Sequence, residues 1–407
     1  MPTLLQINVC VNRGSTGRIA EQIGEAVMSR GWSSYIAYGR GDSHSTSHTI
    51  KIGSRLGVAL HALLTRITDR HGLYSRIATK RLIRQIESIA PDIIHLHNIH
   101  GYYINYQVLF SYLREAKIPV VWTLHDCWAM TGHCSHFEYV GCARWKTGCY
   151  DCPQKNAYPR SWLIDNSRNN YSEKCSQFTS IENLTLVPVS DWLGAVAKES
   201  NLGEYNIRVI HNGIDTCVFT PVANSTLRQQ YGISDDKKIV LGVASPWSKQ
   251  KGFNDFIKLN EHLSKQRYQI VMVGISEGQR RKLPNSIIGI PRTSDIYELV
   301  GWYSAADVFV NPTYEDSYPT TNLEALSCGT PVITYKTGGS SESVNSDMGR
   351  VVDKGSVEGL AEAIEELCKE NRTAMREKCR AYAVAHFDKR DCFREYIDLY
   401  EEILQKR

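Results

Sequence analysis

The sequence has no apolar run long enough to cross a bilayer, and its first residues, MPTLLQINVCVNRG, turn polar too soon for a secretory signal. We therefore expect a cytoplasmic protein. The net charge of +4 over 407 residues is too small to favour nucleic acid as a partner. Neither an internal repeat at solenoid periods nor a low-complexity run is present. These absences indicate an ordinary globular chain.

A glycine-rich dinucleotide fingerprint is also missing. The first predicted strand is not followed by GxGxxG, and the second ends in Tyr38-Gly39-Arg40, without an acid. In NAD-binding Rossmann folds such an acid binds the ribose, so the sequence argues against a dehydrogenase of this type.

Short apolar, β-branched runs alternate with helical patterns along the whole chain. LLQINV, PDIIHLH and IPVVWTLH are typical of buried strands in the first half, and KKIVLGVA, YQIVMVG and TPVITY in the second. This alternation predicts an α/β protein made of two tandem Rossmann-like, doubly wound domains. Because ligands of open α/β sheets bind beyond the carboxyl ends of the strands, we expect the two domains to face a central cleft.

The sequence also suggests where the domains begin and end. We place the N-terminal domain at residues 1–190 and the C-terminal domain at 191–385, with the join in the polar, Pro-containing region that includes HNGID. The segment 386–407 ends in a helix with an apolar stripe, formed by Tyr396, Leu399, Ile403 and Leu404. We expect this helix to pack back on the N-terminal domain.

The stretch PTYEDSYPTTNLEALSCGTPVIT, residues 312–334, predicts a short helix between a loop and a buried strand. Pro319 suits the start of the helix and Gly329 its end. The N-terminus of such a helix stabilises an anion such as a diphosphate. Asp316 and Glu324 would repel phosphate, so neutral hydroxyls are better partners for them. A sugar nucleotide offers both groups, whereas surface acids that cap the helix are the simpler alternative.

This stretch resembles the E-x7-E region of the retaining GT-B glycosyltransferases of family GT4, and the resemblance covers essentially the whole chain. It implies that Glu324 binds the ribose of the nucleotide. The first acid, either Asp316 or its neighbour Glu315, would then bind the donor sugar. The nearby polar residues implied in donor binding are Ser317, Thr320, Thr321 and Asn322.

ASPWSKQKGF is similar to the loop in which the family carries an Arg and a Lys that hold the diphosphate. Lys251 matches the Lys, but Ser245 stands at the Arg position. Lys249 can supply the missing positive charge, although a lysine in such a loop can also be an ordinary surface residue.

The segment NRGSTGR, between the first strand and the first helix, is similar to the family's Gly-rich loop. Gly14 and Gly17 would let the donor approach the backbone there. Asn12 and Arg13 would lie on the acceptor side. HNGID resembles the family's NG-[IV]-D stretch at the start of the second domain, and its Asn-Gly pair is also a common turn signal.

His125, at the end of WTLHDCW, matches a family His that reaches the donor sugar, and Asp126 is a weaker candidate on the acceptor side. The resemblance implies a retaining, front-face mechanism with His125, Lys251, Asp316 and Glu324 as the catalytic set. The leaving diphosphate would be stabilised by Lys251 and the helix N-terminus. The sequence has no Asp-x-Asp, so we expect no cofactor in catalysis.

Five of the twelve cysteines crowd into an insert at residues 127–152. A reducing compartment favours metal binding over disulfides for such a cluster. We expect a structural zinc held by Cys134, Cys142, Cys149 and Cys152, with Cys127 as a further candidate. Unligated thiols and a redox CxxC remain alternatives.

The segment 51–84 is rich in Lys and Arg and contains a single acid, Asp69, over a helical apolar pattern. One or two core-packing helices with a solvated basic face are slightly favoured. The alternative is a peripheral contact with anionic lipid headgroups or with a phosphorylated lipid acceptor.

The leading hypothesis is a retaining glycosyltransferase that moves a sugar from a UDP- or GDP-sugar to a saccharide or lipid-linked acceptor. The resemblance suggests a role in bacterial surface polysaccharide synthesis (capsule, exopolysaccharide or lipopolysaccharide), at the inner face of the membrane. The alternative is a catalytically silent protein that binds sugar nucleotides or serves as a zinc-stapled scaffold. Ser245 at the family's Arg position keeps this alternative open. A GT-B sugar-nucleotide epimerase is a second one.

Overall fold

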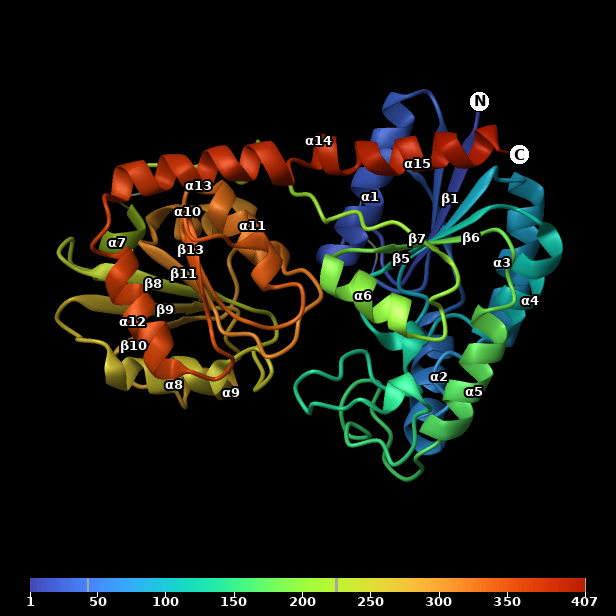
Figure 1. Ribbon diagram of the computed structural model, residues 1–407, viewed down its shortest axis with the longest axis horizontal. Helices are drawn as coiled ribbons and strands as arrows, with labels where there is room; N and C mark the ends of the chain where they lie inside the picture. Colours follow the sequence, from blue (N-terminus) through green and yellow to red (C-terminus); the bar gives the residue numbers. More distant parts are fainter. Residues whose placement is uncertain (42–43, 224–225, 407) are drawn as a thin grey trace. The chain divides into compact units, whose positions relative to one another are not determined.

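The computed structural model describes residues 1–41, 44–223 and 226–406. It divides into two compact units, shown in Figure 1. Unit 1 comprises Met1–Asn212 together with the chain from Cys392 onward, and unit 2 comprises Gly213–Asp391. Each unit is a parallel sheet covered by helices, which confirms the predicted pair of doubly wound α/β domains.

Unit 1 contains a seven-stranded sheet in the order β3-β2-β1-β4-β5-β6-β7. Its strands are β1 (Thr3–Asn8), β2 (Ser33–Tyr38), β3 (His48–Lys51), β4 (Ile93–Leu96), β5 (Val120–Leu124), β6 (Leu184–Pro188) and β7 (Asn206–Ile207). Its helices are α1 (Gly14–Ser29), α2 (Arg55–Thr68), α3 (Arg76–Ile89), α4 (Tyr106–Ala116), α5 (Ser167–Phe178), α6 (Asp191–Glu199) and α15 (Arg394–Gln405). The strands β4 and β5 are buried throughout, as expected for the central strands of a sheet covered on both faces.

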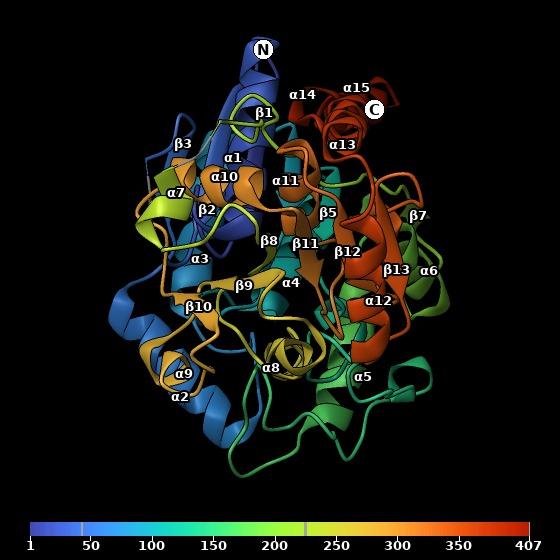
Figure 2. The ribbon, with the colours of Figure 1, turned by 90° about the vertical axis from the view of Figure 1, so that its left-hand side faces the viewer.

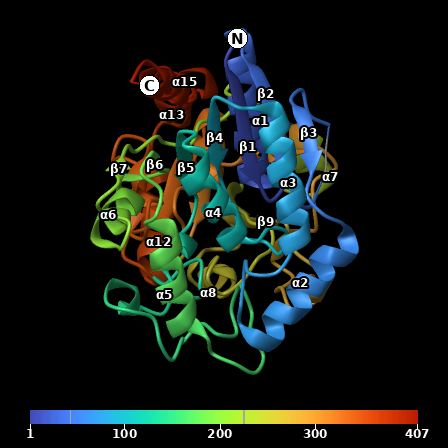
Figure 3. The same ribbon diagram turned by 90° about the vertical axis from the view of Figure 1, so that its right-hand side faces the viewer.

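Helices α1 and α15 share one face of this sheet. Ile23 of α1 and Tyr396 and Tyr400 of α15 belong to the same buried cluster as residues of β1, β4, β5 and β6. On the other face, Phe110 of α4 packs edge-on against Trp122 of β5, with ring centroids 5.5 Å apart. Figure 3 shows α3 and α4 on the side of the sheet away from α15.

Unit 2 contains a six-stranded sheet in the order β10-β9-β8-β11-β12-β13, shown in Figure 2. Its strands are β8 (Lys238–Val243), β9 (Tyr268–Val273), β10 (Ile287–Ile290), β11 (Val308–Asn311), β12 (Val332–Tyr335) and β13 (Gly349–Val352). Its helices are α7 (Thr226–Gln230), α8 (Phe253–His262), α9 (Glu277–Arg280), α10 (Ile296–Ala305), α11 (Thr320–Ser327), α12 (Val357–Leu367) and α13 (Arg372–Phe387), while α14 (Lys389–Cys392) leads back to unit 1.

The boundary between the units differs from the sequence expectation. It lies between Asn212 and Gly213, inside HNGID, and not after residue 190. Helix α6 and strand β7 belong to unit 1 because β7 pairs with β6 and extends its sheet. At the other end the chain returns to unit 1 at Cys392, six residues later than expected, because α13 belongs to unit 2.

Among the described residues, no helix combines the length and the apolar character that crossing a membrane requires.

Candidate active site

In unit 2, the loops that follow β8, β11 and β12 meet at one edge of the sheet. These strands are neighbours in the order β8-β11-β12, so their carboxyl ends lie together. The backbone N–H of Tyr314 donates to the carbonyl of Gln250 at 2.7 Å, and that of Gly339 donates to the carbonyl of Asp316 at 3.1 Å. The three loops therefore form one connected surface at the place where open α/β sheets bind ligands.

Lys251 and Asp316 form an ion pair across two of these loops. The Nζ of Lys251 lies 2.5 Å from Oδ2 of Asp316, and 36% of the lysine side chain is exposed. Gly252 allows the loops to approach because its φ is +72° and a Cβ would lie 2.4 Å from the carbonyl oxygen of Pro312. Asp316 is thus the acid in contact with Lys251, whereas Glu315 is half-buried beside it.

The other two residues expected in the diphosphate loop, Ser245 and Lys249, are exposed. Trp247 between them is buried, and its indole N–H donates to the carbonyl of Val273 at 2.8 Å. This contact fixes the loop to the end of β9 and leaves the two polar side chains at the surface.

Helix α11 begins at Thr320, with Pro319 at the N-cap position, and Gly329 follows its end with φ +78°, as the sequence predicted. Proline supplies no side-chain cap, so the first turn keeps backbone N–H groups for other acceptors. Thr320 and Thr321 of this turn are half-buried. Within the described chain, the hydroxyl of the buried Ser317 has no hydrogen-bond partner. A buried polar group of this kind is costly unless a ligand or water satisfies it.

Glu324 lies one turn into α11 and is 5% exposed. The hydroxyl of Tyr303, on α10, donates to Oε2 of Glu324 at 2.9 Å. A carboxylate can accept several hydrogen bonds, so this one leaves capacity for a ligand hydroxyl.

Asn322, expected to contact the donor, has a different role. Its side chain is fully buried; the amide Nδ2 donates to Ser343 Oγ at 3.0 Å, and Oδ1 accepts from Asn311 at 2.8 Å. The side chain therefore fixes α11 to the end of β11 and to the loop between β12 and β13.

In unit 1, residues 9–13 connect β1 to the first turn of α1. The helix begins at Gly14, inside NRGSTGR, so the predicted Gly-rich loop is short. Asn12 donates through Nδ2 to the carbonyl of His44 at 2.7 Å, and its backbone N–H donates to the carbonyl of Gly17 at 3.1 Å. A Cβ on Gly17 would lie 3.3 Å from the Asn12 nitrogen, which explains the small residue there. Arg13 is exposed.

His125 follows β5 and belongs to a chain of polar side chains. Gln6 donates through Nε2 to the carbonyl of Ala20, so its Oε1 accepts from Nε2–H of His97 at 3.0 Å. His97 Nδ1 then accepts from Nε2–H of His125 at 3.1 Å. Burial lowers the pKa of His125 to about 4. The imidazole is therefore neutral near pH 7, with its lone pair on Nδ1.

Asp126 is engaged within unit 1. Its Oδ2 lies 2.8 Å from Nε2 of His100, and Oδ1 accepts from the backbone N–H of Trp128 at 2.9 Å. Burial alone would raise the pKa of Asp126, but the interactions with His100 and this N–H lower it to about 2. These contacts favour a role in shaping the turn after β5.

The cysteine-rich insert is an irregular loop with two single turns of 3₁₀ helix, Trp128–Met130 and Arg144–Lys146. No disulfide joins the twelve cysteines, all of which the structure describes. A small pocket is lined by Cys134, Cys142, Cys149 and Cys152, the four expected zinc ligands. Cys127 is completely buried and does not line this pocket.

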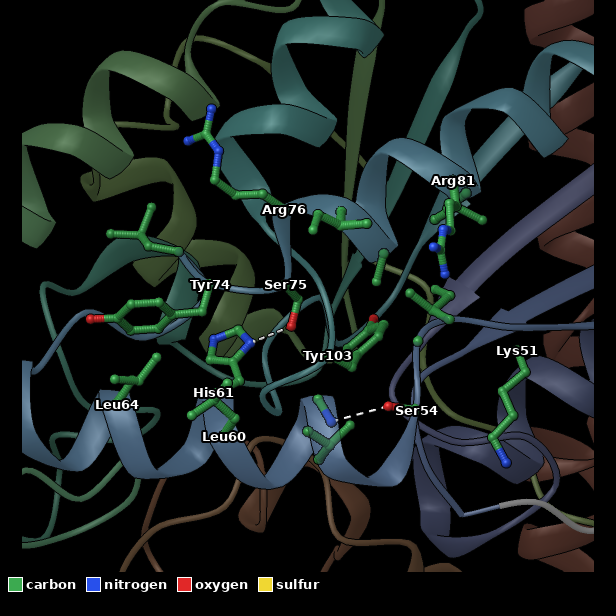
Figure 4. Close-up of a pocket in the computed structure, with 18 of the residues that line it drawn as sticks. Lys51, Ser54, Leu60, His61, Leu64, Tyr74, Ser75, Arg76, Arg81 and Tyr103 are labelled. Carbon is green, nitrogen blue, oxygen red and sulfur yellow. Dashed lines mark hydrogen bonds between the residues drawn. The ribbon is translucent and has the colours of Figure 1, made fainter.

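The basic segment forms α2 and α3, with a groove of about 900 Å³ between them (Figure 4). Leu60, His61 and Leu64 of α2 line it, and Lys51 and Arg81 lie toward the end where α2 begins. Several large apolar side chains of this region are exposed, namely Leu56, Leu60, Leu63 and Ile77. Two helices form in this segment, and Leu82 and Ile86 of α3 are buried, whereas α2 leaves much of its apolar surface exposed.

Two residues of these sites escaped the sequence analysis: Tyr303 and His97. Ser317 is already among the residues implied in donor binding, and the structure adds that its buried hydroxyl has no partner among the described residues. Tyr303 and His97 act through contacts with residues 21 and 28 positions away, which local patterns do not reveal. His97 does stand in HLHNIH at a predicted strand end, which was a usable signal.

Comparison with known families covers both units. The profile "Glycosyltransferase Family 4" matches residues 16–217, and "Glycosyl transferases group 1" matches residues 224–386. The chain therefore belongs to the group 1, family 4 glycosyltransferases.

Two curated relatives illustrate the range of similarity. A protein of Escherichia coli (strain K12) described as the colanic acid biosynthesis glycosyl transferase WcaC is 27% identical over 376 residues, which are 86% of this chain and 87% of the relative. A D-inositol 3-phosphate glycosyltransferase of Corynebacterium jeikeium is 31% identical over 48% of this chain and 52% of the relative.

Solved structures with the same fold include a sucrose-phosphate synthase from Thermosynechococcus elongatus. It has a TM-score of 0.74 and 18% identity, and all of both chains is covered. Anabaena HepE, solved in complex with UDP-glucose, has a TM-score of 0.69 and 17% identity over 98% of this chain and 99% of HepE. These likenesses establish the GT-B fold.

Proposed function

We propose that this glycosyltransferase uses a nucleotide-sugar donor, with UDP as the first nucleotide to test, and retains the anomeric configuration. The proposal rests on the side chains gathered where β8, β11 and β12 end in unit 2. There Lys251, Asp316 and the Ser317 hydroxyl, which has no partner among the described residues, lie beside the start of α11, and Glu324 lies one turn into this helix. Cationic, hydroxyl and carboxylate groups in this order suit a diphosphate flanked by sugar hydroxyls. The UDP-glucose complex of HepE supports the choice of UDP.

The ion pair between Lys251 and Asp316 suggests how donor binding proceeds. A diphosphate carries more charge than a carboxylate, so it would draw the Lys251 ammonium away from Asp316. The carboxylate of Asp316 would then accept from hydroxyls of the donor sugar, as Glu324 would from the ribose. During transfer, Lys251 and the N–H groups of α11 would stabilise the negative charge that develops on the leaving diphosphate.

His125 would take part as a neutral hydrogen-bonding group. Its pKa of about 4 keeps it unprotonated, so it would accept through Nδ1 from a hydroxyl and would not act as a general acid near pH 7. The chain from Gln6 through His97 would hold the ring in that tautomer.

The donor assignment is tested by thermal unfolding with UDP-, GDP-, ADP- and dTDP-sugars, because a ligand that binds only the native state raises its apparent stability. We expect one nucleotide to stabilise wild type and to lose this effect in Lys251→Ala. Product stereochemistry by NMR, with and without EDTA, tests retention and metal independence. A chain that binds a donor but neither transfers nor hydrolyses it would be a sensor.

We further propose that the acceptor is a phosphorylated lipid carrying a saccharide, at the inner face of the bacterial membrane, in the synthesis of a surface polysaccharide. The groove between α2 and α3 supports this, because its apolar wall continues into exposed leucines and Lys51 and Arg81 provide positive charge at one end. Such a surface fits an acyl or polyprenyl chain with its phosphate. The description of WcaC as a colanic acid enzyme supports the polysaccharide.

Flotation with phosphatidylcholine vesicles, with and without phosphatidylglycerol, tests the lipid contact. We expect wild type to float with the anionic vesicles, and the double variant Leu56→Ser/Leu60→Ser to stay in the unbound fraction. The matched control is Tyr297→Ser, which removes a large, strongly exposed side chain from unit 2. Equal retention of wild type and the leucine variant would exclude this groove as the lipid site.

A further inference from the structure

The pocket in the cysteine-rich insert is also lined by a histidine, His133. This residue is 2% exposed, and among the described residues its Nε2 has no hydrogen-bond partner. A buried imidazole nitrogen without a partner is unfavourable, and here it lies in the pocket that Cys134, Cys149 and Cys152 also line. The arrangement calls for a group that accepts an electron pair.

The other nitrogen of the ring determines which form His133 takes. Nδ1 lies 2.5 Å from Oδ1 of Asp69, the residue that ends α2, and both side chains are completely buried. The carboxylate accepts a hydrogen bond, so Nδ1 carries the proton and Nε2 keeps its lone pair. Metal-binding histidines are held in this way by a carboxylate on the far side of the ring.

Three thiols of the same pocket make contacts that hold them in place. Cys134 and Cys152 are hydrogen-bonded to each other through their side chains. Cys149 accepts a hydrogen bond at Sγ from the backbone N–H of Gly132 at 3.1 Å. In the sequence, Cys149 and Cys152 are separated by two residues, which is a common spacing for two thiolate ligands of one tetrahedral zinc ion.

We propose that the insert binds one zinc ion through His133, Cys134, Cys149 and Cys152, and that Cys142 is not a ligand. His133 takes the fourth position because it is more deeply buried than Cys142 and its Nε2 is unsatisfied. In the part of the chain that the structure describes, no three of these ligand atoms lie within 4.8 Å of one another. Binding therefore requires the thiol side chains to rotate toward the pocket centre.

The zinc ion would stabilise more than the insert. Asp69 also accepts a hydrogen bond at Oδ2 from the backbone N–H of Asn166 at 2.8 Å, and its carbonyl accepts from Asn170 Nδ2 at 2.5 Å. His133 and Asp69 would thus connect the ion to the end of α2 and to the start of α5. Loss of the metal would loosen all three segments.

The test is the zinc content of the purified protein after dialysis against a weak chelator, measured by inductively coupled plasma mass spectrometry. We expect one zinc per chain in wild type, in Cys142→Ser and in the control His136→Ala, which changes a neighbouring histidine that does not line the pocket. We expect no retained zinc in His133→Ala.

Two further measurements keep the proposal testable if His133→Ala does not fold. Asp69→Asn preserves the shape of the side chain, and it should weaken zinc affinity about 10- to 100-fold in chelator competition. His133→Cys should restore zinc as a fourth thiolate. Loss of zinc in Cys142→Ser with zinc retained in His133→Ala would overturn the ligand assignment. A zinc-free wild type with a Cys149–Cys152 disulfide would overturn the site itself.

Discussion

Replacing Glu324 with glutamine separates a role in donor binding from a role in the fold. The side chain is 5% exposed and accepts a hydrogen bond from Tyr303 at 2.9 Å. Glutamine has nearly the same shape, and its remaining oxygen can still accept from Tyr303. The free energy of unfolding should therefore change by less than about 1 kcal/mol. Alanine would instead remove the carboxylate that accepts from the buried Tyr303 hydroxyl.

The effect on donor affinity should be much larger. In the proposed site Glu324 accepts from ribose hydroxyls, and glutamine replaces one charged acceptor oxygen with an NH₂ group. Hydrogen bonds to charged groups contribute about 1.5–3 kcal/mol, and about 1.4 kcal/mol corresponds to a factor of ten. We therefore expect the Kd for the nucleotide to rise about 10- to 150-fold.

Isothermal titration with the nucleotide that stabilises wild type, combined with urea unfolding of both proteins, provides the measurement. Tyr303→Phe is the matched control, because it removes the same internal hydrogen bond and leaves the carboxylate of Glu324 in place. A Glu324→Gln variant that binds nucleotide within about threefold of wild type would refute the ribose contact. Equal losses of affinity in both variants would indicate that Glu324 acts by positioning α11.

Three further outcomes are expected. Lys251→Ala should weaken nucleotide binding about 10- to 150-fold, since it removes a charge-assisted contact to the diphosphate, while calorimetry on Lys265→Ala, an exposed lysine of unit 2, should match wild type. Burial lowers the pKa of His125 to about 4, against about 6.5 when unfolded, so the unfolded state binds more protons between these values. The free energy of unfolding should consequently fall as the pH drops from about 6.5 to about 4, and a pH series of denaturation curves should show a smaller fall in His125→Asn. Tyr400→Phe should lower the free energy of unfolding by about 1–3 kcal/mol, because it leaves Nδ1 of buried His95 without the hydroxyl at 2.6 Å; urea curves unchanged from wild type would contradict this.

Local patterns predicted the elements well and the contacts between them poorly. Buried apolar runs such as those of β5 and β8 identify strands, and the Pro319 and Gly329 signals place α11. The pairing of β7 with β6, which moves the domain boundary to residue 212, depends on a two-residue strand too short to show a pattern.

The candidate sites show the same division. The family's motifs named Lys251, Asp316 and Glu324 as candidates, and the structure brings Lys251 and Asp316 into contact. The motifs did not reveal that Asn322 is consumed by internal hydrogen bonds. Nor could they connect His133 with Asp69, which is 64 positions earlier in the chain, because that contact exists only after the insert has folded against α2.

The return of α15 to unit 1 has a consequence for how this protein is made. The hydroxyls of Tyr396 and Thr123 form a hydrogen bond of 3.0 Å, and the hydroxyl of Tyr400 contacts Nδ1 of His95. The last helix therefore completes the core on one face of β4 and β5. A ribosome synthesises unit 1 first, yet these residues emerge only after all of unit 2. The first part of the chain must therefore wait, with part of one apolar face of its sheet uncovered, until α15 has been synthesised.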